Sequence, residues 1–126
     1  MSAQERLHRA LTKLPGVVCS PSMFADRPAY WVNGKEIAHF ESPDALDIRL
    51  TRVEIRARRA QLVEAGCVQL RASTSDWLTV DVSSRAGVEL ARELAGRSAA
   101  LHAAPPGQAA AEPPKGSTLA SRRRFH

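Results

Sequence analysis

The dipeptide Asn33-Gly34 constrains the fold of this chain more than any other feature, because it lies between two strand-like runs, at 29–32 and 35–40. A two-residue turn of type I′ needs positive φ at both central positions, and Asn-Gly is the pair best suited to that requirement. The sequence therefore predicts a β-hairpin at this point, and with it an antiparallel sheet.

Three helices are expected around this sheet. Apolar residues recur at helical spacing before a Pro15-Gly16 stop, and Thr51 can cap a second helix, with Glu54 as its capping-box partner. The predicted helices span residues 3–14, 51–65 and, after a cap at Ser83 or Ser84, a segment that ends near residue 101. The predicted strands span residues 17–19, 29–32, 35–40, 46–50, 67–72 and 77–82. The expected fold class is α+β, an antiparallel sheet of about five to six strands with three helices, in the order α-β-β-β-β-α-β-β-α.

The composition changes sharply near residue 103, where the chain reads AAPPGQAAAEPPK and loses its apolar periodicity. Residues 1–103 are therefore expected to form one α+β domain, and residues 104–126 a disordered, basic tail rich in Ala and Pro. The tail carries a charge of +3 out of the net +5 of the chain. Because the domain itself is close to neutral, nucleic-acid binding is not expected, or at most weakly through the tail.

The expected compartment is the cytoplasm. Cys19 and Cys67 belong to no C-x-x-C motif, and the polar N-terminal residues do not resemble a secretion signal. No apolar stretch approaches the roughly 20 residues that span a bilayer, so no membrane association is expected. The sequence leaves the oligomeric state open.

Alternation along the strands divides the predicted sheet into an apolar face and a polar face. Residues two apart share a face, which places Leu78, Val80 and Val82 toward the helices. The polar face then presents Asp47, Arg49, Gln69, Arg71, Trp77, Thr79 and Asp81. In the strand at 35–40 the assignment stays open: if Phe40 faces the core, His39 and Glu41 join the polar face, and if Ile37 does, Glu36 joins it.

This polar face is open to two interpretations. Arg49 and Arg71 could bind an anionic group, Trp77 could stack on a planar ligand, and His39 could move protons near neutral pH. Alternatively, Asp and Arg side chains simply pair across an exposed sheet that Trp77 covers.

Known cofactor motifs give no further signal. His8, His39, His102 and His126 match no zinc spacing, and there is no G-x-G-x-x-G, phosphate loop or G-x-S-x-G. The sequence therefore predicts neither a metal nor a cofactor.

Three segments, WVNGKEIAHF (31–40), LDIRLTR (46–52) and SDWLTVDV (75–82), resemble a small bacterial family of unknown activity. That family is called luciferase-like because it is similar to the domain of fungal luciferases. The resemblance covers residues 30–100 and implies, for the fungal members, cofactor-free oxidation of an aromatic pyrone by oxygen. The family's strand often reads His-x-His, and of these two positions only His39 matches here. The positions that match the pattern are Glu36, His39, Asp47, Arg49 and Trp77.

The sequence thus leads to two hypotheses of function. The favoured one is a domain that binds a small planar or anionic ligand, or a partner, on its polar face through Glu36, His39, Asp47, Arg49, Arg71 and Trp77. The alternative is a cofactor-free, oxygenase-like enzyme that acts on a planar acidic or aromatic substrate at the same face.

Overall fold

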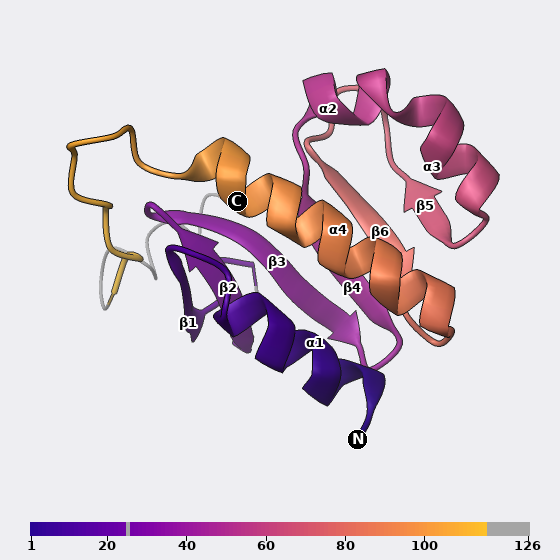
Figure 1. The fold of residues 1–126 in the computed structure, drawn as a ribbon, viewed down its shortest axis with the longest axis horizontal. Helices are drawn as coiled ribbons and strands as arrows, with labels where there is room; N and C mark the ends of the chain where they lie inside the picture. Colours follow the sequence, from indigo (N-terminus) through magenta and orange to yellow (C-terminus); the bar gives the residue numbers. More distant parts are fainter. Residues whose placement is uncertain (25, 116–126) are drawn as a thin grey trace.

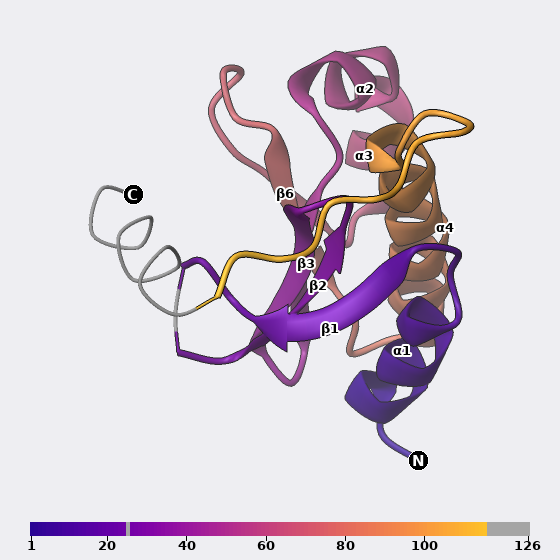
Figure 2. The same ribbon diagram turned by 90° about the vertical axis from the view of Figure 1, so that its left-hand side faces the viewer.

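A computed structural model describes residues 1–24 and 26–115 and gives a two-layer α+β fold, as predicted (Figure 1). Six strands form one sheet in the order β1-β2-β3-β4-β6-β5, and every neighbouring pair is antiparallel. Helices α1 and α4 lie on the same side of this sheet (Figure 2). The strands are β1 (Val17–Pro21), β2 (Pro28–Val32), β3 (Lys35–Ser42), β4 (Ala45–Arg49), β5 (Val68–Leu70) and β6 (Trp77–Asp81).

The predicted hairpin joins β2 to β3. Asn33 and Gly34 both have positive φ, 49° and 73°, as a turn of type I′ requires. This prediction is confirmed.

The helices are α1 (Ala3–Thr12), α2 (Arg52–Ala57), α3 (Arg59–Ala65) and α4 (Arg85–His102). The single helix predicted at 51–65 is therefore two short ones, which meet at Arg58, a residue outside helical geometry with φ −103° and ψ 7°. Thr51 and Gly66 mark the two ends of this region as predicted, since the Thr51 hydroxyl accepts from the Glu54 N–H and Gly66 is left-handed. None of the helices described is long and apolar enough to cross a membrane.

The hydrophobic core lies between the sheet and the pair α1 and α4. Leu7 and Leu11 of α1 and Leu94 of α4 are at most 1% exposed and pack onto the sheet. The predicted inward residues of β6, Leu78 and Val80, are fully buried in the same core.

A β-bulge between β2 and β3 determines which side chains of β3 face the core. Tyr30 pairs with Ala38, but the next residue, Trp31, pairs with Glu36, so Ile37 is an extra residue on β3. Ile37 and Ala38 both enter the core. The bulge therefore resolves the open assignment of β3 in an unexpected way, because it puts Glu36 and His39, three residues apart, on the same face.

Part of the predicted tail is described, up to residue 115. This segment returns along the β1-β2 end of the sheet (Figure 2), where the Ala111 N–H donates to Asn33 Oδ1 at 2.8 Å. The basic residues 122–124, through which at most weak nucleic-acid binding was expected, lie outside the described residues.

Candidate functional site

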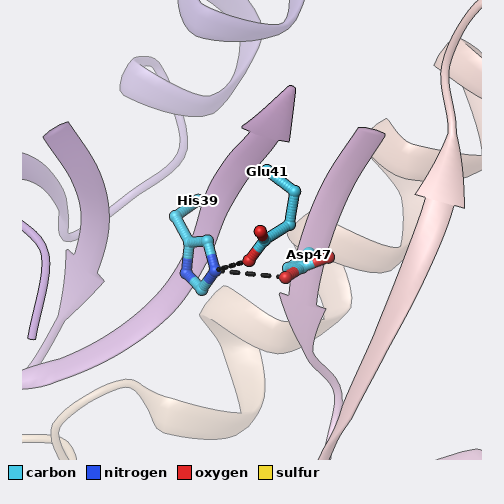
Figure 3. Close-up of side chains that lie close together, drawn as sticks. All are labelled: His39, Glu41 and Asp47. Carbon is cyan, nitrogen blue, oxygen red and sulfur yellow. Dashed lines mark hydrogen bonds and ion pairs between the residues drawn. The ribbon is translucent and has the colours of Figure 1, made fainter. Parts of the chain in front are cut away.

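Four ionisable side chains meet on the sheet face opposite α1 and α4. They are Glu36, His39 and Glu41 of β3 and Asp47 of β4, and we call them the histidine cluster (Figure 3 draws three of them). His39 and Asp47 are directly paired across β3 and β4. The bulge at Ile37 brings in Glu36, and Glu41 lies at a second register shift, between Phe40 and Ser42 in the pairing of β3 with β4.

Both ring nitrogens of His39 face carboxylates. Nδ1 lies 2.8 Å from Glu36 Oε2, while Nε2 lies 3.0 Å from Glu41 Oε1 and 3.1 Å from Asp47 Oδ2. An imidazole whose two nitrogens both meet acceptors is best satisfied when both carry a proton. The geometry therefore favours the imidazolium form.

The carboxylates of the cluster are themselves held in place. The Ser22 hydroxyl donates to Glu36 Oε2 at 2.7 Å, and the Met23 N–H donates to Glu36 Oε1. On the other side, the Thr79 hydroxyl donates to Asp47 Oδ1 at 2.6 Å, and Arg71 lies 2.8 Å from Asp47 Oδ2. Strands β3, β4 and β6 and the loop before β2 thus fix one continuous polar network.

The electrostatics of the cluster agree with this geometry. Burial alone would lower the pKa of His39, but hydrogen bonds to Asp47, Glu36 and Glu41 outweigh it and raise this pKa to about 9. Burial would likewise raise the pKa of Asp47, yet its bonds to His39 and Thr79 and the charge of Arg71 hold it well below its usual range. Near neutral pH, His39 is therefore a cation facing an Asp47 anion.

Two aromatic rings cover the imidazole. The Trp77 ring centre lies 5.1 Å from that of His39, and the Phe24 ring centre lies 5.5 Å from it. Phe24 and Trp77 also meet edge to face at 5.3 Å. Both aromatic residues are half-buried, so this ring group forms the boundary between the cluster and the solvent.

The interpretation of this face as an exposed sheet does not hold at its centre. Glu36 and Asp47 are each 1% exposed and His39 is 5% exposed. The reason is the loop between β1 and β2, which bonds to Glu36 and places Phe24 over the imidazole. Toward the β5 edge the face is open as predicted, since Gln69, Arg71 and Asp81 are exposed.

The structure brings together most of the predicted site residues. Hydrogen bonds and ion pairs join Glu36, His39, Asp47 and Arg71, and Trp77 touches the imidazole. Arg49 is the register partner of Trp77 but, within the described residues, no hydrogen bond or ion pair links its side chain to the cluster.

Sequence reasoning did not identify several residues of this site. Ser22, Met23 and Phe24 lie between two predicted strands, in a stretch for which the sequence predicts no element or role, and Thr79 was placed on the polar face without a role. The sequence offers no spacing signal for the loop residues, because their contacts depend on how the loop folds back on β3.

One subset of the cluster has the composition of a metal-binding site. The ligand atoms of His39, Glu41 and Asp47 all lie within 4.8 Å of one another, and they combine one nitrogen with two carboxylate oxygens.

The family model described as "Luciferase domain" matches residues 34–98, from the turn before β3 into α4, which is just over half of the 126-residue chain. The matched segment contains the entire histidine cluster together with Arg71, Trp77 and Thr79. A search of the curated proteins and of the solved structures found no match. On the strength of the family match, the chain belongs to the Luciferase domain family.

Proposed function

We propose that this protein binds a small, planar, hydroxyl-bearing molecule beside the ring group of Phe24, His39 and Trp77. The observation that carries this proposal is the position of two half-buried aromatic rings directly against a buried polar cluster. Flat apolar surface next to a few fixed polar groups is typical of small-molecule sites. A planar ligand would stack on Trp77 and present its polar edge to the cluster.

The charges of the site favour an uncharged ligand over the anionic one considered from sequence. Arg71 is paired with Asp47, His39 faces three carboxylates, and Arg27 lies 4.0 Å from Glu41. These three cations balance the three carboxylates Glu36, Glu41 and Asp47, so none of the three is left unpaired to attract an added anion.

Glu41 and Arg49 supply the groups that such a ligand needs. The Glu41 side chain is 49% exposed and accepts hydrogen bonds, which suits a ligand hydroxyl. Arg49, beside Trp77 in the sheet register, only donates, which suits a ring carbonyl. Hydroxylated pyrones and coumarins combine these features, and an aromatic pyrone is also what the family resemblance implies for the fungal members.

A thermal-shift screen tests this proposal, run with the full chain in the presence of EDTA. The panel pairs neutral hydroxypyrones and hydroxycoumarins with carboxylated analogues of the same ring size. We expect the neutral compounds to raise the melting temperature, and Trp77→Leu and Arg49→Ala to weaken that binding about tenfold or more. Phe40→Leu, on the helix side of β3, is the matched control and should bind as the wild type does. Equal binding by Trp77→Leu, or binding of carboxylated compounds alone, would contradict the proposal.

An enzymatic role is the second candidate, and the pair Glu36 and His39 favours it. A buried carboxylate behind one ring nitrogen of a histidine is typical of acid–base histidines, and the other nitrogen, Nε2, faces the half-exposed Glu41, which could pass a proton to a ligand. Compounds that bind in the screen should then be incubated with the protein in an oxygen electrode. Oxygen uptake that needs both protein and compound, and that Glu36→Gln abolishes, would support oxygenase-like chemistry. If the compound stays intact and no oxygen is taken up, the result supports a domain that only binds its ligand.

A further inference from the structure

We propose that Nε2 of His39 and one carboxylate oxygen each of Glu41 and Asp47 form a binding site for a divalent transition-metal ion. This inference goes beyond the proposed ligand site and needs no organic ligand. It places one nitrogen and two oxygen ligands at the centre of the sheet face, on two adjacent strands.

The spacing of the three atoms is suited to a metal. Zinc and related ions bind imidazole nitrogen and carboxylate oxygen at about 2.1 Å, so two ligands lie about 3.0 Å apart at right angles and about 3.4 Å apart at the tetrahedral angle. Nε2 of His39 lies 3.0 Å from Glu41 Oε1 and 3.1 Å from Asp47 Oδ2. The two separations from His39 Nε2 are therefore close to those that a bound ion would impose, and the two carboxylate oxygens lie within 4.8 Å of each other, a gap that the half-exposed Glu41 side chain can adjust without movement of the strands.

The groups behind the ligands strengthen this interpretation. A metal-binding histidine commonly donates its other N–H to a carboxylate, which fixes the ring and its tautomer. Here Nδ1 faces Oε2 of the buried Glu36 at 2.8 Å, and Glu36 is held by the Ser22 hydroxyl and the Met23 N–H. Nδ1 thus keeps its proton when a metal binds, and Nε2 becomes the ligand by releasing its own proton.

Asp47 is oriented in the same manner. The Thr79 hydroxyl donates to its Oδ1 at 2.6 Å, so that Oδ2 is the oxygen that faces His39. Glu41 closes the site from the solvent side with a half-exposed carboxylate. Three protein ligands with one side toward solvent leave coordination positions for water, as in metal sites that exchange ligands.

Arg71 can distinguish a metal site from a network of ion pairs within the protein. Its Nη2 lies 2.8 Å from Asp47 Oδ2, the oxygen that would also bind the metal. A metal and this guanidinium would compete for one oxygen. The Arg71 side chain is 39% exposed, so it can swing into solvent when an ion enters. Removal of Arg71 should therefore tighten metal binding. If the cluster only balances charges within the protein, removal of Arg71 should not create specific affinity for a metal ion.

The donor set narrows the class of metal. One imidazole and two carboxylates, with no thiolate, suit Zn²⁺, Co²⁺, Mn²⁺ and Fe²⁺. The sequence does not predict this site, because known zinc spacings contain several histidines or cysteines, whereas this site uses one histidine with carboxylates brought together by β3–β4 pairing.

The test is titration of the full chain, made without a polyhistidine tag and stripped with chelator, with CoCl₂ and with ZnCl₂ at pH 7.5. We expect one ion per chain by calorimetry. Glu41→Gln, at a half-exposed position that should not disturb folding, should weaken binding about tenfold or more. Glu64→Gln, the same change at an exposed residue of α3, is the control and should bind as the wild type does. Arg71→Gln should bind at least threefold more tightly.

A second measurement needs no variant at the buried ligands. In the wild type, ¹⁵N spectra of the histidine rings should show that Zn²⁺ shifts Nε2 of His39 while Nδ1 keeps its proton. Absence of stoichiometric binding, equal affinities of Glu41→Gln and wild type, or Zn²⁺ shifts confined to other histidines would each overturn the proposal. Because this test uses metal alone and the ligand screen uses EDTA, failure of one does not imply failure of the other.

Discussion

Raising the pH from 6.5 to 9 should destabilise the folded protein through His39. The pKa of this buried histidine is raised in the folded state from 6.5 to about 9, despite burial, by the carboxylates of Asp47, Glu36 and Glu41. A group whose folded-state pKa is raised contributes all of its stabilisation below the unfolded pKa and loses it as the pH passes the folded pKa. At about 1.4 kcal/mol for each pKa unit, this difference corresponds to about 3 kcal/mol.

The other groups with shifted pKa values change the folding stability mainly outside the range from pH 6.5 to 9. Burial lowers the pKa of His102, which affects stability below pH 6.5, and the low pKa of Asp47 acts in acid. Burial raises the pKa of the Cys19 thiol above its ordinary value of 9.0, and this thiol therefore affects stability above pH 9. The loss of folding stability between pH 6.5 and 9 should therefore come mainly from His39.

The assay is urea unfolding, followed by circular dichroism at half-unit steps from pH 6 to 9 with EDTA present. The free energy of unfolding of the wild type should fall by about 3 kcal/mol across this range, and that of His39→Gln should change by less than about 1 kcal/mol. A flat wild-type curve, or an equal slope in the variant, would refute the reasoning. So would an NMR titration in which His39 deprotonates near pH 6.5.

Three further outcomes are expected from urea or thermal unfolding. Trp77→Ala, at a half-buried ring, should lower the free energy of unfolding by less than the roughly 3–5 kcal/mol that is typical of a core aromatic. Leu78→Ala, at the next and fully buried position, should lower it by about 2–5 kcal/mol. Complete unfolding of Trp77→Ala would contradict the first expectation. Gly34→Ala should cost about 1 kcal/mol or more, because φ is 73° and a Cβ there would lie 3.1 Å from the Ala111 Cβ. Its cost should fall in a chain that ends at residue 103, and an unchanged cost would count against the tail contact. That truncation alone should lower the melting temperature by only a few degrees, since one hydrogen bond from Ala111 is lost; a drop above about 10 °C would show that the tail stabilises the domain far more.

Local patterns in the sequence were sufficient to predict most of the fold. The Asn33-Gly34 pair specified a turn that only two positive φ values allow, and the alternation of Leu78 and Val80 identified the core side of β6. In both cases the signal lies within a few residues of the structure it determines, so no long-range contact was needed to interpret it.

The centre of the site depends on contacts that no local pattern records. Alternation allowed either His39 or Glu36 on the polar face, and the bulge at Ile37 places both there. Burial of the cluster depends on Ser22 and Phe24, which reach it only because their loop folds over β3. A polar strand face without that loop would be solvated, which is what period-2 reasoning assumes.

The bulge in β3 also affects how relatives of this protein should be aligned. In this chain the carboxylate and the histidine that it supports are separated by two residues, in a Glu-x-x-His spacing. A family member whose β3 runs without the bulge would have to carry them as Glu-x-His to keep both on one face, since regular strands repeat every two residues. A one-residue gap at this point of an alignment would then record a change in strand geometry, and a gapless alignment would pair this glutamate with a core position.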